Sequence, residues 1–128
     1  MMPAGKYYIG DLCYVMHGEW DEFCDITISG SSCLDGEFSL KDGRLFASYG
    51  TMHGDGCYDG LSVDAGLIGC IRVEDIDLSD DSNDINLGMV VEFDRPFSTG
   101  SRDGVIFFGD EININTNGCE EEEEDYND

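Results

Sequence analysis

A chain of 128 residues has the length of one ordinary domain, and its seven Phe and six Tyr supply the bulky side chains that a packed core needs. Its charge is unusual, because 29 acidic residues against 6 basic residues give a net charge of −23. A charge of this size repels nucleic acid and anionic lipid, which argues against direct binding to DNA, RNA or a membrane surface. Among macromolecular partners, this charge favours a basic protein.

The first expected elements lie in residues 7–16, YYIGDLCYVM, where aromatic and aliphatic residues flank Gly-Asp. This pattern predicts two short strands around a bend. In the following GEWDEFCDI, Trp20, Phe23 and Cys24 have the i, i+3, i+4 spacing of one helix face. We expect a short helix that places Trp20 and Phe23 on a sheet.

Three later segments have the pattern of strands. Residues 37–49, EFSLKDGRLFASY, alternate on both sides of Asp42-Gly43 and predict a hairpin with its turn at that pair. Residues 63–73, VDAGLIGCIRV, are apolar with interspersed small residues and predict a buried central strand with close backbone approach. Residues 88–97 and 104–116 flank the turn-rich STGSRDG and predict a second, longer hairpin.

Short strands with one helix predict a compact α+β domain that is predominantly antiparallel β, with the helix packed on a sheet or a partly open barrel. We assign residues 1–116 to this single domain and residues 117–128 to an acidic disordered tail. Seven acids lie in residues 120–128, so the rest of the chain still carries −16 of the −23. The acidity therefore belongs to the domain as well as to the tail.

The N-terminal MMPAGKYYIG lacks the apolar run of a signal peptide, and nowhere do eighteen apolar residues follow one another. We therefore expect a cytoplasmic protein whose six cysteines are reduced and mostly buried. The sequence contains no CxxC pair, which gives a structural zinc site little support.

The pentapeptide GDLCY at residues 10–14 returns as GDGCY at residues 54–58. The residues that follow the two copies differ, so a duplication does not explain the repetition. The preferred interpretation is a shared local shape, in which Gly-Asp turns the chain into a strand. The alternative is that Asp11 and Asp55 converge as paired carboxylates for acid/base work or a divalent cation.

The glycine-rich segment 49–60, YGTMHGDGCYDG, is the best candidate for a small-ligand, metal or catalytic site, because its four glycines let backbone approach a ligand. The candidate residues are Asp11, His53, Asp55, Cys57 and Asp64. No cofactor is expected beyond a divalent cation in this alternative. An enzyme is the less favoured outcome, because Cys57 and His53 are neighbours in sequence only.

The densest acidic stretch within the domain is EDIDLSDDSND, residues 74–84, which contains no basic residue. It predicts an exposed loop. The candidate partner-binding residues are Glu74, Asp75, Asp77, Asp80, Asp81 and Asp84. The alternative is a solvated surface loop without a specific role.

The motifs GKYYIGDLCYV, WDEFC, ASYGTMHGDGCYDG, VDAGLIGCIRV and FFGDEININT, in this order, resemble a family of small uncharacterised proteins of bacteria and their phages. The resemblance covers most of residues 5–116 and implies an association with mobile elements, but no reaction and no catalytic residue. With the charge, it favours a non-enzymatic interaction protein. Such a protein would inhibit a nucleic-acid-binding or defence protein by mimicking the charge of DNA.

Overall fold

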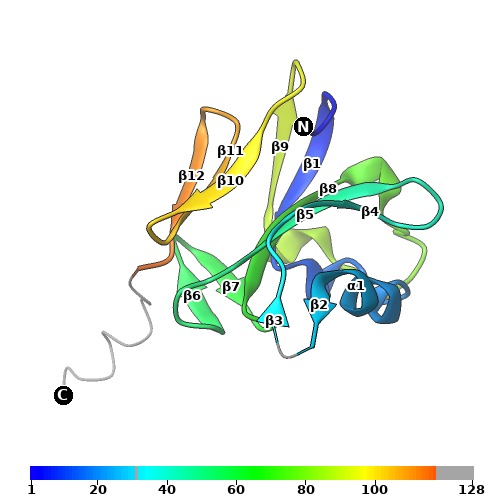
Figure 1. The fold of residues 1–128 in the computed structure, drawn as a ribbon. Coiled ribbons are helices and arrows are strands. Elements are labelled where there is room, and N and C mark those ends of the chain that lie inside the picture. Colours follow the sequence, from blue (N-terminus) through cyan, green and yellow to red (C-terminus); the bar gives the residue numbers. More distant parts are fainter. Residues whose placement is uncertain (31, 118–128) are drawn as a thin grey trace.

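The computed structural model describes residues 1–30 and 32–117. The predicted tail therefore lies outside the described residues, apart from Asn117. The described chain forms a five-stranded sheet, a three-stranded sheet and two two-stranded pairs, together with one α-helix (Figure 1). All strand pairs are antiparallel, which confirms the predicted α+β, predominantly antiparallel architecture.

The five-stranded sheet has the strand order β4-β5-β8-β1-β9. Its strands are β1 (Gly5–Gly10), β4 (Gly36–Ser39), β5 (Leu45–Gly50), β8 (Leu67–Arg72) and β9 (Met89–Phe93). The three-stranded sheet consists of β10 (Thr99–Arg102), β11 (Val105–Phe108) and β12 (Ile112–Asn115). The short pairs are β2 (Ile28–Ser29) with β3 (Ser32–Cys33), and β6 (Gly56–Tyr58) with β7 (Leu61–Val63).

The helix α1 (Trp20–Thr27) packs on one face of the five-stranded sheet, as the sequence predicts. The rings of Trp20 and Phe23 stack with their centroids 4.5 Å apart, and the ring of Phe23 lies 5.1 Å from that of Phe46 in β5. Asp21 and Glu22 lie in the first turn, where their carboxylates complement the positive end of the helix. The core on this face also contains Tyr8, Leu12, Val15, Met16, Leu40, Ile71 and Ile76.

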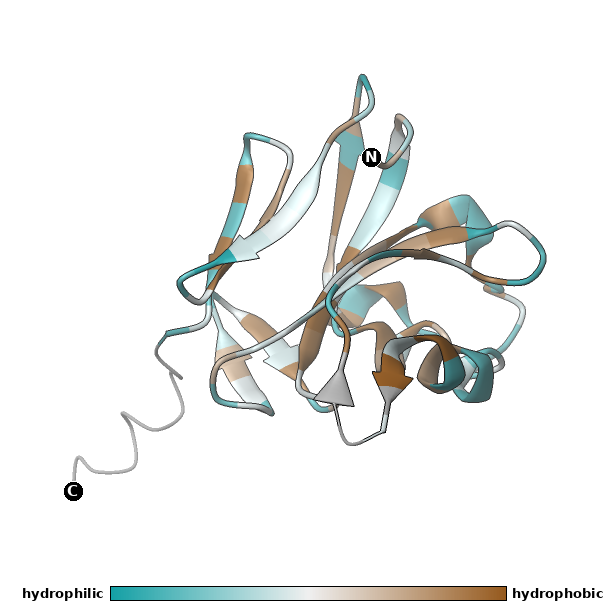
Figure 2. Cartoon of the chain, in the orientation of Figure 1, coloured by the Kyte–Doolittle hydropathy of each residue, from teal (hydrophilic) through white to brown (hydrophobic). Residues whose placement is uncertain are grey.

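The three-stranded sheet and the β6–β7 hairpin pack on the opposite face of the large sheet. Because side chains alternate along a strand, Tyr7 and Ile9 of β1 lie in this second core, whereas Tyr8 lies in the core beneath α1. The second core also contains Ala47, Tyr49, Tyr58, Leu61, Val63, Ile68, Cys70, Phe97, Ile106, Phe108 and Ile114. Figure 2 shows hydrophobic colouring on much of β8 and β9, and hydrophilic colouring at the tip of the β4–β5 hairpin and on the outer turns of α1.

Two predicted strand regions are confirmed. β4 and β5 pair with Phe38 opposite Phe46, and the turn between them places Gly43 at φ +98°, a conformation that favours glycine. β8 lies between β5 and β1 in the middle of the sheet, although it begins only at Leu67. A Cβ atom at Gly69 would lie 2.0 Å from the carbonyl oxygen of Ala47, so the predicted close backbone approach is present.

The second strand predicted within residues 7–16 is wrong. After β1 the chain forms a 3-10 turn, η1 (Leu12–Tyr14), with Asp11 as its N-cap. The N–H groups of Val15 and Met16 both donate to the carbonyl of Leu12, and the Asp11 carboxylate accepts from Cys13 N–H. The capping carboxylate favours a turn at this position over an extended strand.

The predicted hairpin between residues 88–97 and 104–116 is also wrong. β9 pairs with β1 at the edge of the large sheet, and the turn-rich segment 98–104 contains β10, which pairs with β11. β11 then pairs with β12 around Gly109, whose φ is +68°. The residue pattern identifies extended segments, whereas the partner of each strand depends on how the whole domain packs.

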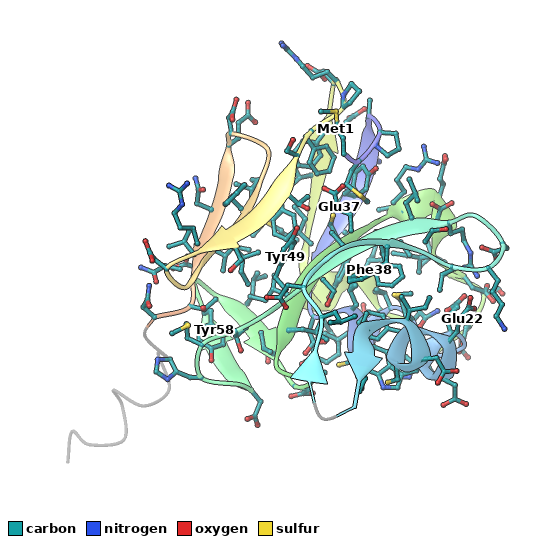
Figure 3. The ribbon with its side chains drawn as sticks, in the orientation of Figure 1. Met1, Glu22, Glu37, Phe38, Tyr49 and Tyr58 are labelled. Carbon is teal, nitrogen blue, oxygen red and sulfur yellow. The ribbon has the colours of Figure 1, made fainter. Side chains whose placement is uncertain are left out.

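Glu37 connects the two larger sheets. Its Oε2 atom accepts hydrogen bonds from the N–H group and the hydroxyl of Thr99 in β10, at 3.2 and 2.7 Å, and its Oε1 atom pairs with the terminal ammonium of Met1. The Thr99 hydroxyl also lies 2.7 Å from the hydroxyl of Tyr49. Figure 3 labels Glu37, Tyr49 and Met1. Burial acts to raise the pKa of Glu37, but these hydrogen bonds outweigh it and hold the pKa below its usual value of 4.5.

Replacing Glu37 with glutamine is expected to reduce the free energy of unfolding by about 1–2 kcal/mol at pH 7, because hydrogen bonds to a charged acceptor are lost. Since folding lowers this pKa, the carboxylate stabilises the protein fully above pH 4.5 and loses its effect as the pH falls through the folded value. Urea unfolding at pH 7 and pH 3 measures this, and the difference from wild type should shrink at pH 3. An equal difference at both pH values would contradict the assignment.

Candidate functional site

The Asp11 carboxylate is fully buried and joins two distant parts of the chain. Its Oδ1 atom accepts from the N–H of Cys13 at 2.9 Å. Its Oδ2 atom accepts from the N–H groups of Asp64 and Ala65 at 2.7 and 2.6 Å. The Tyr8 hydroxyl donates to the Asp11 carbonyl at 2.9 Å. Both oxygens of the carboxylate thus hold backbone amides, which is a structural role.

The second copy of the pentapeptide has a different structure. Asp55 is exposed, and the residues after it form β6. Tyr58 is buried, and its hydroxyl donates to the carbonyl of Gly54 at 2.9 Å. The prediction of a shared turn that leads into a strand is therefore correct for this copy and wrong for the first copy.

The two copies are linked through backbone groups. The second copy begins the β6–β7 hairpin, and this hairpin leads directly into Asp64 and Ala65, whose amides bind Asp11. The side chain of Asp64, one of the predicted ligands, is exposed. Asp11 thus fixes the turn that follows the second copy.

Residues of the glycine-rich segment hold the end of β12. The Nε2 atom of His53 lies 2.7 Å from the carbonyl oxygen of Asn117. The Oδ2 atom of Asp59 accepts from the N–H of Asn115 at 2.9 Å. Asp59 itself has a φ of +49° and turns β6 into β7. The segment that we predicted to approach a ligand thus contacts the C-terminal part of the described chain.

The cysteines of the two pentapeptide copies, Cys13 and the candidate site residue Cys57, are half-buried. Burial raises the pKa of Cys13 to about 12, and the hydrogen bond to Asp11 and its negative charge act in the same direction. A thiol with this pKa is protonated at neutral pH and is a poor nucleophile. Within residues 1–30 and 32–117, no three or more His, Cys, Asp or Glu side chains are placed so that they could hold a metal ion.

The six acids predicted to bind a partner lie in a turn-rich segment between β8 and β9. It includes two 3-10 turns, η2 (Val73–Asp75) and η3 (Ile85–Leu87). Glu74 and Asp75 each lie 3.6 Å from Arg72. Three carboxylates cap local turns by accepting backbone N–H groups, namely those of Asp77, Asp80 and Asp84. Asp81 is exposed.

Asn83 fixes this segment to the domain. The side chain is buried; its Oδ1 atom accepts from the N–H of His17 at 3.1 Å, and its Nδ2 atom donates to the carbonyl of Asp77 at 3.0 Å. The N–H of Asp84 donates to the carbonyl of Tyr14 at 2.9 Å. The acids between these anchors are therefore held on a defined surface next to η1.

Arg44 gathers three acidic segments at one end of the molecule. Its guanidinium lies 2.8 Å from Glu19, which precedes α1, and 2.8 Å from Asp42 in the β4–β5 turn. It also donates to the carbonyl of Asp75 at 3.1 Å. The hydrogen bond to Asp42, followed by that to Glu19, raises the pKa of Arg44 against the effect of burial. Arg44 therefore joins the helix, the hairpin and the 74–84 segment.

A further contact joins the same elements, because the N–H of Lys41 donates to the carboxylate of Glu22 in α1 at 2.6 Å. We call this surface the acidic end. The three segments that form it carry eleven carboxylates, those of Glu19, Asp21, Glu22, Asp25, Asp42, Glu74, Asp75, Asp77, Asp80, Asp81 and Asp84. The cations on the same elements are Lys41, Arg44 and Arg72, and the last two are already in ion pairs. The carboxylates thus greatly exceed the cations that face them.

Sequence reasoning identified only the acids of residues 74–84 and missed those of α1 and the hairpin. The sequence feature that could have indicated this larger surface is Arg44, one of only six basic residues, which directly follows the Asp-Gly turn.

The part of the chain that the structure describes contains no helix long and apolar enough to cross a membrane. Comparisons with protein-family models, with curated proteins and with solved structures give no match.

Proposed function

We propose that this protein is a non-enzymatic interaction protein that binds a basic protein through its acidic end. The observation that carries the proposal is the set of bonds made by Arg44, which pairs with the carboxylates of Glu19 and Asp42 and donates to the backbone carbonyl of Asp75, and so joins three acidic segments. Surfaces of one charge sign accelerate the association of oppositely charged partners and select among them.

The partner class is a nucleic-acid-binding or defence protein of bacteria. Duplex DNA carries one charge for about every 1.7 Å of its axis, and a protein that reads this charge presents lysine and arginine side chains. A rigid surface with many carboxylates offers such a protein a competing anion. The motif order that resembles bacterial and phage proteins supports the same assignment, as does the expected cytoplasmic location.

The test uses the immobilised full-length chain and the fraction of a bacterial lysate that heparin retains, at low and at moderate salt. We expect a stoichiometric partner that survives moderate salt and that duplex DNA displaces. A variant with five Glu→Gln substitutions at Glu120–Glu124 measures how much of the partner binding depends on the charge of these residues.

Neutralising the acidic end with Asp77→Asn, Asp80→Asn and Asp81→Asn is expected to weaken binding of the purified partner about tenfold, at roughly 0.5 kcal/mol for each charge. Asparagine keeps the Oδ1 acceptor that closes the turns at residues 77 and 80. Calorimetric titration measures the dissociation constant.

The matched control removes the same charge elsewhere, with Asp35→Asn, Asp55→Asn and Asp103→Asn, all exposed in the structure. It should retain the wild-type affinity. If both triple variants lose affinity equally, the attraction follows net charge alone and the acidic end is not the binding surface.

A further inference from the structure

A second surface of this protein combines a hollow with aromatic and acidic side chains. The hollow has a volume of about 450 Å³ and is lined by residues of the β9–β10 turn and the β11–β12 turn. Figure 1 shows these two turns on the side of the domain away from α1. Phe93 and Phe97 line it, together with four carboxylates, those of Glu92, Asp94, Asp110 and Glu111. Sequence reasoning attached no function to these residues.

The two aromatic rings of the hollow are held rigidly. Phe93 and Phe97 stack with their centroids 3.8 Å apart and their planes 14° apart, and Tyr7 packs edge-on against both at 5.8 and 5.0 Å. Gly109 faces them from the other turn, and a Cβ atom there would lie 3.4 Å from atoms of both phenylalanines. The φ of Gly109 is +68°, so glycine both forms the turn and leaves room for the two rings beside it; Phe97 is 6% exposed, whereas Phe93 is half-buried.

The four carboxylates are exposed, and none forms a hydrogen bond or ion pair with another residue of ranges 1–30 and 32–117. They differ in this respect from the acids of residues 74–84, most of which cap turns or pair with Arg72. Two positive groups also line the hollow. Arg95 is exposed on the β9–β10 turn, and the terminal ammonium of Met1 is paired with Glu37. The carboxylates therefore outnumber the cations around the rings.

We propose that this hollow binds the guanidinium group of an arginine side chain on a basic protein. A guanidinium is planar, stacks on aromatic faces and binds carboxylates through two parallel hydrogen bonds. The hollow offers both partners, the half-buried ring of Phe93 and carboxylates that no other group of the described chain occupies. The proposal depends on the proposed function only in that the partner is basic, and it assigns the partner's arginine to a site separate from the acidic end.

The experiment measures the binding of a small probe to the hollow in the absence of a protein partner. The full-length protein, labelled with nitrogen-15, is titrated with N-acetyl-arginine amide and followed by the amide NMR signals of Phe93, Phe97 and Gly109. The neutral analogue N-acetyl-citrulline amide has nearly the same shape without the charge, and N-acetyl-lysine amide has the charge without the planar fork. We expect saturable shifts for the arginine probe, at least about threefold weaker binding of the lysine probe and no saturation with citrulline.

Two variants and a control sharpen the result. The double variant Glu92→Gln, Asp110→Asn is expected to lower the affinity for the arginine probe about fivefold. Arg95→Ala is expected to raise this affinity about twofold, because it removes a charge of the same sign as the probe. The control variant is Asp103→Asn. Asp103 is exposed in the turn between β10 and β11, outside the hollow, so its replacement should leave the affinity for the arginine probe unchanged.

Equal affinities of the arginine and citrulline probes would overturn the proposal. NMR shifts that are as large for residues of the acidic end as for residues of the hollow would also overturn it. Tighter binding of lysine than of arginine would overturn the assignment of the side chain. Because the probe is a small molecule, these outcomes are independent of whether a protein partner is captured through the acidic end.

Discussion

Replacing Asp11 with asparagine is expected to reduce the free energy of unfolding by about 2–4 kcal/mol. Asparagine offers one acceptor oxygen, whereas the buried carboxylate accepts from Cys13, Asp64 and Ala65 through both of its oxygens. Whichever way the amide is placed, its NH₂ group faces a backbone N–H, which leaves buried donors without an acceptor. Urea denaturation followed by tryptophan fluorescence measures the change, since Trp20 of α1 packs against the core beneath the helix.

The matched control is Asp55→Asn, the same substitution in the second copy of the pentapeptide. Asp55 is exposed, so its replacement should change the stability by no more than about 0.5 kcal/mol. Both variants lower the net negative charge by the same amount, which cancels any general relief of self-repulsion. Equal stabilities of the two variants would show that Asp11 does not hold the two segments together.

The second large effect is expected for Gly69→Ala in the central strand β8. A methyl group at this position would lie 2.0 Å from the carbonyl oxygen of Ala47 and 2.9 Å from the Leu12 side chain, so the backbone of β5 or β8 must move. We expect a loss of more than about 3 kcal/mol, at the upper end of the range for overpacked cores. Thermal and urea unfolding measure it.

Gly18→Ala provides the comparison, because a Cβ atom at Gly18 would contact nothing within 4 Å. The added methyl should leave the stability unchanged or raise it by up to about 1 kcal/mol through the unfolded chain. A comparable loss in both variants would contradict the assignment of the Gly69 effect to contact with Ala47.

The local features of this fold follow from contiguous residues and were predictable. The Asp42-Gly43 hairpin, the helix that carries Trp20 and Phe23, and the central strand of residues 67–72 each have a periodicity or a turn signal within a short window. The structure confirms these elements because their geometry depends little on what they pack against.

Strand pairing and the fate of the repeated pentapeptide depend on distant residues. In the first copy, Leu12–Tyr14 form a 3-10 turn after the end of β1, with Asp11 as its N-cap, and the Asp11 carboxylate also binds the amides of residues 64 and 65. Similarly, β10 has little apolar pattern of its own. A Cβ atom at Gly100 would lie 2.3 Å from the Phe107 ring, so that ring covers the glycine and supplies the packing that the strand lacks.

The candidate site shows the same division. The acids of residues 74–84 could be found from composition alone. The contact of this segment with α1 and the hairpin depends on Arg44, whose three partners are distant from one another in sequence. The hollow beside Phe93 was not predictable, because it lies between two turns whose relative position is set by the pairing of β9 with β1 and of β11 with β12.

The contacts at the end of β12 determine how the protein can be attached to a surface. Met52 N–H binds the Thr116 hydroxyl, and His53 binds the carbonyl of Asn117, so the chain has a fixed exit point beside the β6–β7 hairpin. Figure 1 shows this point on the side of the domain away from α1. Coupling to a sensor chip through the C-terminus would therefore leave the acidic end facing solution, whereas random coupling through amines would engage Lys41 within it.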